Sequence, residues 1–287
     1  MKNSHSPETF RKNANPQSAI ESEKPFMKRT ILSLLIVATS SFVSFTSPAA
    51  ARQSPFTPEQ ERRIGEIAAD YLVAHPDVLI TVSKKIQEQQ RQRVQLNYAV
   101  RVMDNQKLLL NDADTPATGP ARAKVAVITF FDYQCVFCSR LAPGLEKIML
   151  ARPDVLYVFK ELPIFGERWE NSRKAAERGL SVWKQKGADA YMTYHNAIYR
   201  TGHDEGNLSA EDISEASRQA GWKAAPGTED FTPALSRNNE LAAKLGLTGT
   251  PGIIVMPVSD ATPQKITVFP GFIPAEKMLS AIDKASR

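Results

Sequence analysis

The chain has two cysteines, Cys135 and Cys138, separated by two residues in the order Cys-Val-Phe-Cys. Residues Lys124 to Phe131 precede this pair, and their β-branched and aromatic side chains predict a buried strand. Residues Ser139 to Leu150 follow it with apolar side chains at helical spacing. The pair is therefore predicted to lie where a strand ends and a helix begins, so the fold must place a dithiol at such a junction.

A cysteine at the start of a helix faces free backbone N–H groups and the positive end of the helix dipole, which favour a thiolate. We therefore expect Cys135 to be the nucleophile. Cys138 lies one turn further and should be more buried, so it is expected to stay protonated until it resolves a mixed disulfide. A structural disulfide is disfavoured, because so short a loop constrains the unfolded chain little.

A structural zinc site is also disfavoured. Such sites use four protein ligands, and the four histidines offer no second ligand pair at suitable spacing. No metal and no cofactor is therefore expected. Of these histidines, His195 is interpreted as a packed helix residue, since no neighbouring carboxylate or cysteine in the sequence gives it a sharper role.

A second informative segment, Leu247 to Met256, contains Thr-Gly-Thr-Pro-Gly followed by an apolar run. This pattern predicts a turn that leads into a strand, with a proline at the strand's start. The Thr250–Pro251 peptide bond is a candidate for the cis form, which folded chains keep where a site requires it. An ordinary turn proline is the alternative interpretation.

Residues Phe130 to Cys138 read Phe-Phe-Asp-Tyr-Gln-Cys-Val-Phe-Cys. Together with the downstream Thr-Pro-Gly, they resemble the thioredoxin fold, and more specifically the DsbA-like periplasmic thiol oxidoreductases of the suppressor-of-copper-sensitivity type. The resemblance implies that Pro251 is cis and lies beside the cysteines. It also implies that Thr250 presents its backbone to an extended substrate peptide, so both are expected substrate-binding residues.

The two residues between the cysteines, Val136 and Phe137, are expected to tune the redox properties. Neither is a histidine or a proline, so a thiolate at Cys135 would be stabilised mainly by helix-terminal N–H groups. We expect a reduction potential between roughly −270 and −120 mV, the interval between thioredoxin and DsbA.

The sequence departs from the resembling family at Thr129. Many DsbA-like members have a buried glutamate at this position, which serves as a proton acceptor beneath the cysteines. Asp132 and Glu161 are the nearest acidic candidates in the sequence, and the sequence does not choose between them.

The N-terminal region changes composition abruptly. Residues 1–26 are polar and mixed in charge, and they are expected to be untranslated or disordered. Residues 27–51 combine Met27-Lys28-Arg29, an apolar run and small residues near a cleavage site, which is typical of a signal peptide. An uncleaved anchor is disfavoured, because serines and threonines interrupt a run that is short for a spanning helix. We expect Met27 to be the true start, cleavage near Arg52 and a periplasmic mature protein.

The predicted fold class is α/β: a thioredoxin fold with an inserted helical domain, preceded by an N-terminal helical oligomerisation stalk. The expected boundaries are a stalk at 52–111, a polar linker at 112–123, the first part of the thioredoxin fold at 124–163, the inserted helical domain at 164–228 and the second part at 229–287. The formal charge of +5 is mild and the basic residues are interspersed with acidic ones, so nucleic-acid binding is not indicated.

The stalk prediction depends on one long helix, from about Asp77 to Leu110. Positions at spacings of three and four along it form a coiled-coil-like seam that is apolar except in its middle. The seam positions are Leu79, Val82, Ile86, Gln89, Arg93, Leu96, Val100 and Met103. The resembling family has trimeric members, so a homotrimer is expected, with a dimer as a variant. The alternative is that the helix folds back on its own catalytic domain.

Thiol-disulfide exchange on exported polypeptides is the function that these features predict. Disulfide isomerisation is preferred, because an oligomer holds several reactive sites around one misfolded substrate. The expected partners are unfolded or misoxidised exported proteins and a membrane redox partner that resets the cysteines. A monomeric DsbA-like dithiol oxidase and a non-enzymatic Cu(I)-binding protein are the alternatives, although the latter lacks supporting Met or His ligands nearby.

Overall fold

The computed structural model describes residues 54–224 and 229–287. Residues 1–26 and the predicted signal peptide lie outside the described residues. The boundary between the two compact units of the chain falls between Ile64 and Gly65, inside the first helix. Over the two described ranges, no helix is both long and apolar enough to cross a membrane.

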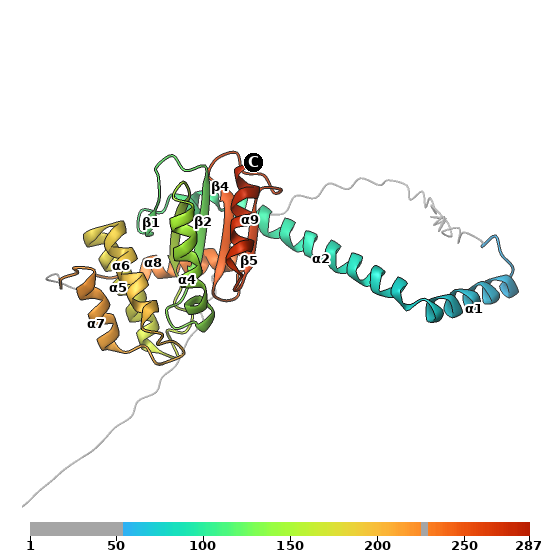
Figure 1. Cartoon of the computed structure of the whole chain (residues 1–287), viewed down its shortest axis with the longest axis horizontal. Coiled ribbons are helices and arrows are strands. Elements are labelled where there is room, and N and C mark those ends of the chain that lie inside the picture. Colours follow the sequence, from blue (N-terminus) through green and yellow to red (C-terminus); the bar gives the residue numbers. More distant parts are fainter. Residues whose placement is uncertain (1–53, 225–228) are drawn as a thin grey trace, which may run out of the picture. The chain divides into compact units, whose positions relative to one another are not determined.

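The described strands form one mixed sheet in the order β1-β3-β2-β4-β5 (Figure 1). Their bounds are β1 Ala117–Thr118, β2 Val125–Phe131, β3 Leu156–Glu161, β4 Gly252–Pro257 and β5 Thr267–Pro270. Strands β2 and β3 are parallel, whereas the other neighbouring pairs are antiparallel. The strand predicted before the cysteines corresponds to β2, and the strand predicted after the Thr-Pro turn corresponds to β4.

The helices follow the predicted apolar spacing closely. Their bounds are α1 Pro58–Ala74, α2 Pro76–Asp104, α3 Gln106–Leu110, α4 Val136–Ala151, α5 Glu170–Lys186, α6 Ala188–Arg200, α7 Ala210–Gln219, α8 Thr232–Leu245 and α9 Ala275–Ser286. The N-terminus of α1 is capped, because the Thr57 N–H donates to the Gln60 side chain at 2.8 Å and the Gln60 N–H to the Thr57 hydroxyl at 3.3 Å. The single long helix predicted to Leu110 is interrupted at Asn105, which separates α2 from α3.

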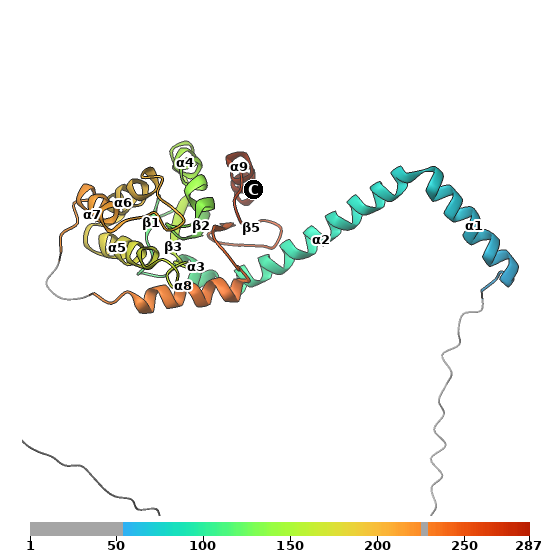
Figure 2. The same cartoon turned by 90° about the horizontal axis from the view of Figure 1, so that it is seen from below.

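The sheet is buried on both faces, so its central strands are apolar at consecutive positions. Alternate side chains of β2, at Val125, Val127 and Phe131, pack in one core with α4, α9 and the inserted helices α5, α6 and α7. The intervening residues Ala126, Ile128 and Phe130 pack in a second core with α3, α8 and the end of α2. Figure 2 shows the sheet between these two helical layers.

The predicted seam on α2 is exposed to solvent. Its six apolar residues are between 38 % (Met103) and 58 % (Ile86) exposed. A different face of the last turns packs on the chain's own domain, through the buried side chains of Ala99 and Val102. The alternative, that the helix packs on its own domain, therefore holds for these last turns only. The seam is left without a packing partner in the single chain.

Gln95 marks where α2 meets the sheet. Its side-chain amide donates to the Val268 carbonyl at 2.8 Å and its oxygen accepts the Val268 N–H at 3.1 Å. Val268 belongs to β5, which is an edge strand of the sheet in the described part of the chain. The amide thus satisfies backbone groups of an otherwise open edge.

The segment predicted as a polar linker, 112–123, is not a free connection. It contains β1, in which Ala117 pairs with Val158 of β3. Asp112 and Thr115 also bind the ammonium group of the fully buried Lys160, at 3.0 and 2.7 Å. The turn residues suggested a loop, but a buried cation on β3 requires these oxygens as partners. The segment is therefore part of the domain that contains the sheet.

Candidate active site at the start of α4

Cys135 is the N-cap residue of α4, and Cys138 lies one turn into the helix. Both are unpaired thiols, and both are buried, at 4 % and 2 % exposed. The Cys135 N–H donates to the Asp132 carbonyl at 3.1 Å, which closes the turn between β2 and α4. The strand and helix predicted on either side of the cysteines thus place the first sulfur at a helix N-terminus.

The two sulfurs have opposite electrostatic environments. A hydrogen bond from the Cys138 side chain, with further ones from Thr250 and from the N–H groups of Cys138 and Phe137, lowers the pKa of Cys135 from 9.0 to about 6, although burial opposes this shift. Burial raises the pKa of Cys138 well above its ordinary value, and hydrogen bonding to Cys135 and the charge of Cys135 raise it further. At neutral pH, Cys135 is therefore the thiolate and Cys138 the thiol.

The sheet register brings the Thr-Pro turn to the same place. Gly252, which opens β4, pairs with Phe130 near the end of β2. The Thr250–Pro251 peptide bond just before it is cis, and the Thr250 carbonyl accepts a hydrogen bond from the Cys135 thiol at 3.2 Å. Four sequence-predicted site residues thus meet: the two cysteines, Thr250 and Pro251.

Thr250 also carries a hydroxyl oxygen that is buried and has no hydrogen-bond partner among the described residues. With Cys135 as a thiol, the sulfur donates to the Thr250 carbonyl. A thiolate would instead accept a hydrogen bond from this hydroxyl, and that contact contributes to the lowered pKa of Cys135. The side chain at position 250 therefore acts on the charge of the sulfur as well as on the shape of the turn.

Val136 and Phe137 form the first turn of α4. The Phe137 side chain is 48 % exposed beside the buried cysteines, and the Arg140 guanidinium lies 5.5 Å from its ring centroid. Neither intervening side chain offers a hydrogen-bond donor, and of this pair it is the Phe137 backbone N–H that lowers the pKa of Cys135.

The two acidic residues left open by the sequence have different surroundings. The Asp132 carboxylate accepts hydrogen bonds from the N–H groups of Gln134 and Phe165 at 2.8 and 2.9 Å, and from the Ser172 hydroxyl at 2.8 Å. Its oxygens are thus occupied in fixing loops. Burial nevertheless raises the pKa of Asp132.

Glu161, at the end of β3, is fully buried. Its Oε1 accepts hydrogen bonds from the hydroxyls of Tyr191 and Tyr133, at 2.9 and 3.1 Å. Its Oε2 is buried with no hydrogen-bond partner, and no cation pairs with it among the described residues. Burial raises the pKa of Glu161 well above its ordinary value. Burial therefore favours the protonated form of Glu161, and its Oε2 has no hydrogen-bond partner among the described residues.

Sequence reasoning missed the aromatic layer around this acid. Tyr133 donates to Glu161 and lies 3.5 Å from the His195 ring nitrogen Nδ1. His195 is buried among aromatic rings, and this burial lowers its pKa to about 3. The prediction of a packed histidine is thus confirmed. The one sequence signal for these aromatic side chains was the position of Tyr133, two residues before Cys135.

Gly179 of α5 makes room for the buried acid. A Cβ atom at this position would lie 2.7 Å from Glu161 Oε1 and 3.3 Å from the Tyr133 hydroxyl. Only a residue without a side chain therefore lets the inserted domain close over the carboxyl group.

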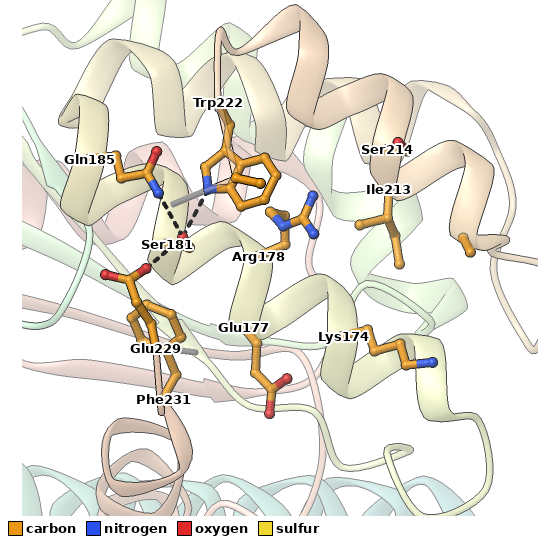
Figure 3. Close-up of a pocket in the computed structure, with 12 residues that line it drawn as sticks. Lys174, Glu177, Arg178, Ser181, Gln185, Ile213, Ser214, Trp222, Glu229 and Phe231 are labelled. Carbon is orange, nitrogen blue, oxygen red and sulfur yellow. Dashed lines mark hydrogen bonds between the residues drawn. The ribbon is translucent and has the colours of Figure 1, made fainter. Parts of the chain in front are cut away.

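A cavity of about 470 Å³ lies between α5, α7 and the segment that leads to α8 (Figure 3). Trp222 and Arg178 form part of its wall, with the guanidinium 3.6 Å from the Trp222 ring centroid. None of its lining residues belongs to the cysteine site. Within the residues that the structure describes, no cluster of three or more His, Cys, Asp or Glu side chains is placed to bind a metal ion.

Two family models match the chain. The model described as Thioredoxin matches residues 111–273, and the model described as Copper resistance protein ScsC N-terminal domain matches residues 60–93. The first match covers the described sheet, the cysteines and the Thr-Pro turn. The second covers most of α1 and the first part of α2, up to residue 93.

Solved structures and a curated protein agree with these matches. BcfH of Salmonella enterica Typhimurium is 34 % identical with a TM-score of 0.66, covering 80 % of this chain and 97 % of BcfH. A linker-deletion mutant of Proteus mirabilis ScsC is 26 % identical with a TM-score of 0.57, covering 82 % and 98 % of the two chains. Disulfide bond formation protein D of Bacillus subtilis (strain 168) is 26 % identical over 152 residues, which cover 49 % of this chain and 67 % of that protein.

The environment of Cys135 generates a first prediction. Absorbance of the reduced protein at 240 nm, which reports thiolate, should rise with a midpoint near pH 6. Because the folded pKa lies below the unfolded one, the thiolate stabilises the reduced fold above the unfolded pKa near 9, and this contribution is lost as the pH falls through about 6. Cys135→Ser should abolish the transition. A wild-type midpoint near 9 would contradict the described environment.

A second prediction concerns Glu161. An acid whose folded pKa exceeds its unfolded value of 4.5 binds more protons in the folded state, so the free energy of unfolding declines as the pH rises above that value. Glu161→Gln keeps the acceptor for both tyrosines and removes the titration. Its stability relative to wild type, measured by urea unfolding, should therefore increase from pH 5 to pH 9. The exposed Glu276→Gln is the control, and a constant difference for Glu161→Gln would refute the raised pKa of the buried acid.

Proposed function

The chain belongs to the thioredoxin family and carries an ScsC-type N-terminal domain, and from this premise we propose that it is an exported disulfide isomerase. Its membership in a family of thiol-disulfide oxidoreductases gives the general chemistry. The observation that carries the proposal is the Cys135 sulfur, which has a pKa lowered to about 6 at the N-terminus of α4 and lies 3.2 Å from the Thr250 carbonyl.

The proposed reaction begins with the Cys135 thiolate. It attacks one sulfur of a wrong substrate disulfide, forms a mixed disulfide and releases the other substrate sulfur as a thiolate. In isomerisation, a different substrate thiolate then attacks the mixed disulfide, forms a new substrate disulfide and restores the Cys135 thiolate. Cys138 can instead resolve the mixed disulfide. After losing its proton it attacks the Cys135 sulfur, which releases reduced substrate and leaves a Cys135–Cys138 disulfide.

The surroundings of the cysteines support a polypeptide substrate. Gly252 at the start of β4 pairs with Pro270 of β5, so Phe272 follows close to the Thr250–Pro251 turn. Phe272 and Phe137 are 45 % and 48 % exposed, which gives apolar contacts to an unfolded chain. In this proposal Thr250 and Pro251 align the substrate backbone, while Val136 and Phe137 tune the redox potential.

The exposed seam of α2 supports an oligomer, which we propose to be a homotrimer, with a dimer as the alternative state. An apolar stripe at heptad-like spacing is stable in water when it faces another helix. Several catalytic domains on one stalk would hold several thiolates around a single substrate, which suits isomerisation better than simple oxidation.

Export and resetting complete the proposal. The signal-peptide pattern of residues 27–51 supports a periplasmic location. In an oxidising compartment an isomerase must be kept reduced, so we propose a membrane redox partner that reduces the Cys135–Cys138 disulfide. The substrates in this proposal are misoxidised exported proteins.

Refolding of a scrambled multi-disulfide protein tests the function. The reduced wild type should accelerate recovery of native substrate, and Cys135→Ser should return recovery to the uncatalysed rate because the nucleophile is lost. Cys138→Ser should accumulate mixed disulfides that appear on non-reducing gels. An oxidised wild type that oxidises reduced substrate, but a reduced one that cannot rescue scrambled substrate, would favour the oxidase. An inactive wild type that binds Cu(I) tightly would favour the copper-binding alternative.

Light scattering tests the oligomer. The mature protein should have a mass above that of one chain, and Ile86→Glu should give monomers because it places a charge within the apolar seam. The neighbouring polar Gln87→Glu is the matched control and should leave the mass unchanged. A monomeric wild type would refute the stalk.

A further inference from the structure

Gln134 directly precedes Cys135 and is 1 % exposed. Its carbonyl accepts a hydrogen bond from the Glu205 N–H at 3.0 Å, and its side-chain Oε1 accepts one from the Gly206 N–H at 2.6 Å. Two consecutive N–H groups of the loop between α6 and α7 therefore bind the residue before the nucleophile. This loop belongs to the inserted helical domain and lies far from Gln134 in the sequence.

The backbone of the loop is held in an unfavourable conformation by this contact. Glu205 has φ of 50°, and among the described residues only Asp260 shares a positive φ without being glycine. Gly206 has φ of 99°, and a Cβ atom there would lie 2.8 Å from Trp169 Nε1. A left-handed non-glycine residue persists where its surroundings fix it. Here the conformation aims two N–H groups at Gln134.

The turn before Cys135 is also held from its other side. The Asp132 carboxylate accepts hydrogen bonds from the Phe165 N–H and the Ser172 hydroxyl. The Asp132 carbonyl accepts the Cys135 N–H and, from α6, the Tyr199 hydroxyl at 3.2 Å. The turn 132–135 is thus enclosed between two segments of the inserted domain, at 165–172 and 199–206.

The position of this turn matters for the sulfur. The N–H groups of Phe137 and Cys138 are fixed in direction by α4, and they stabilise the thiolate only if Cys135 keeps its extended N-cap conformation, with φ of −85° and ψ of 116°. Movement of residue 134 would change where the sulfur lies relative to those groups. Through its contacts with Gln134, the inserted domain therefore influences the position of the Cys135 sulfur.

We propose that Gln134 is a positioning residue, which holds Cys135 over the N-terminus of α4 by binding the 205–206 backbone of the inserted domain. The inference rests on the proposed function for its biological meaning, because it assigns to the inserted domain a part in setting the reactivity of the nucleophile. A purely structural role for Gln134 would change the stability of the fold and leave the ionisation of Cys135 unaltered.

Two substitutions break the contact from opposite sides. Gln134→Met keeps the side-chain length and removes the acceptor of the Gly206 N–H. Glu205→Pro leaves the cysteine motif untouched, removes the N–H that binds the Gln134 carbonyl and forbids positive φ. Glu205→Gly is the matched control, because it keeps the N–H and tolerates the left-handed conformation.

The readouts are the 240-nm thiolate titration and the rate of alkylation by iodoacetamide at pH 6. In Gln134→Met and Glu205→Pro the pKa of Cys135 should rise by about one unit, which lowers the thiolate fraction and slows alkylation several-fold. Glu205→Gly should match wild type. Urea unfolding of each variant verifies that the titrated protein is folded.

Each outcome bears on the proposal. Wild-type titration and alkylation in a folded Gln134→Met would overturn it. A shift in Gln134→Met, but none in a folded Glu205→Pro, would also overturn it, because Gln134 would then act without the inserted domain. If Glu205→Pro does not fold, Gln134→Met against wild type carries the test. Neither readout requires a protein substrate, so failure of the refolding assay with a positive titration result would reject the isomerase function and keep the positioning role.

Discussion

The close approach of the Cys135 sulfur to Thr250, 3.2 Å from its carbonyl oxygen, is the contact on which the site depends. It joins residues 115 positions apart, and it exists because β2 and β4 pair antiparallel, so the end of one lies beside the start of the other. The helix N-terminus lowers the pKa of the sulfur from one side, and the Thr-Pro turn offers a backbone carbonyl and a hydroxyl from the other. A disulfide exchanger requires both a thiolate and a place for an extended chain beside it.

Two consecutive residues of β3 show how the sheet distributes charge. Lys160 and Glu161 point to opposite faces, and both are fully buried. Lys160 reaches Asp112 and Thr115, so the cation is compensated by the segment that first resembled a linker. Glu161 accepts hydrogen bonds from two tyrosine hydroxyls, and burial raises its pKa well above the ordinary value, which favours the protonated acid.

The inserted helical domain is part of the site. Gly179 of α5 leaves space for the Glu161 carboxyl group, and α6 contributes His195 and Tyr199. The same domain holds the turn before Cys135 through Gln134. The first core joins β2, α4 and these helices in one cluster, so the catalytic half of the fold and its insertion share their packing.

The sequence alone determined the strand-to-helix junction at the cysteines and the Thr-Pro turn, because these follow from local spacing and turn chemistry. It also determined the apolar seam of α2, which the structure leaves exposed. Only the tertiary structure decided that 112–123 joins the sheet, that Asp132 fixes loops while Glu161 is buried among tyrosine hydroxyls, and that Gln134 binds 205–206. Those features depend on which distant segments supply partners to buried polar groups, and residue spacing along a chain carries no information about such partners.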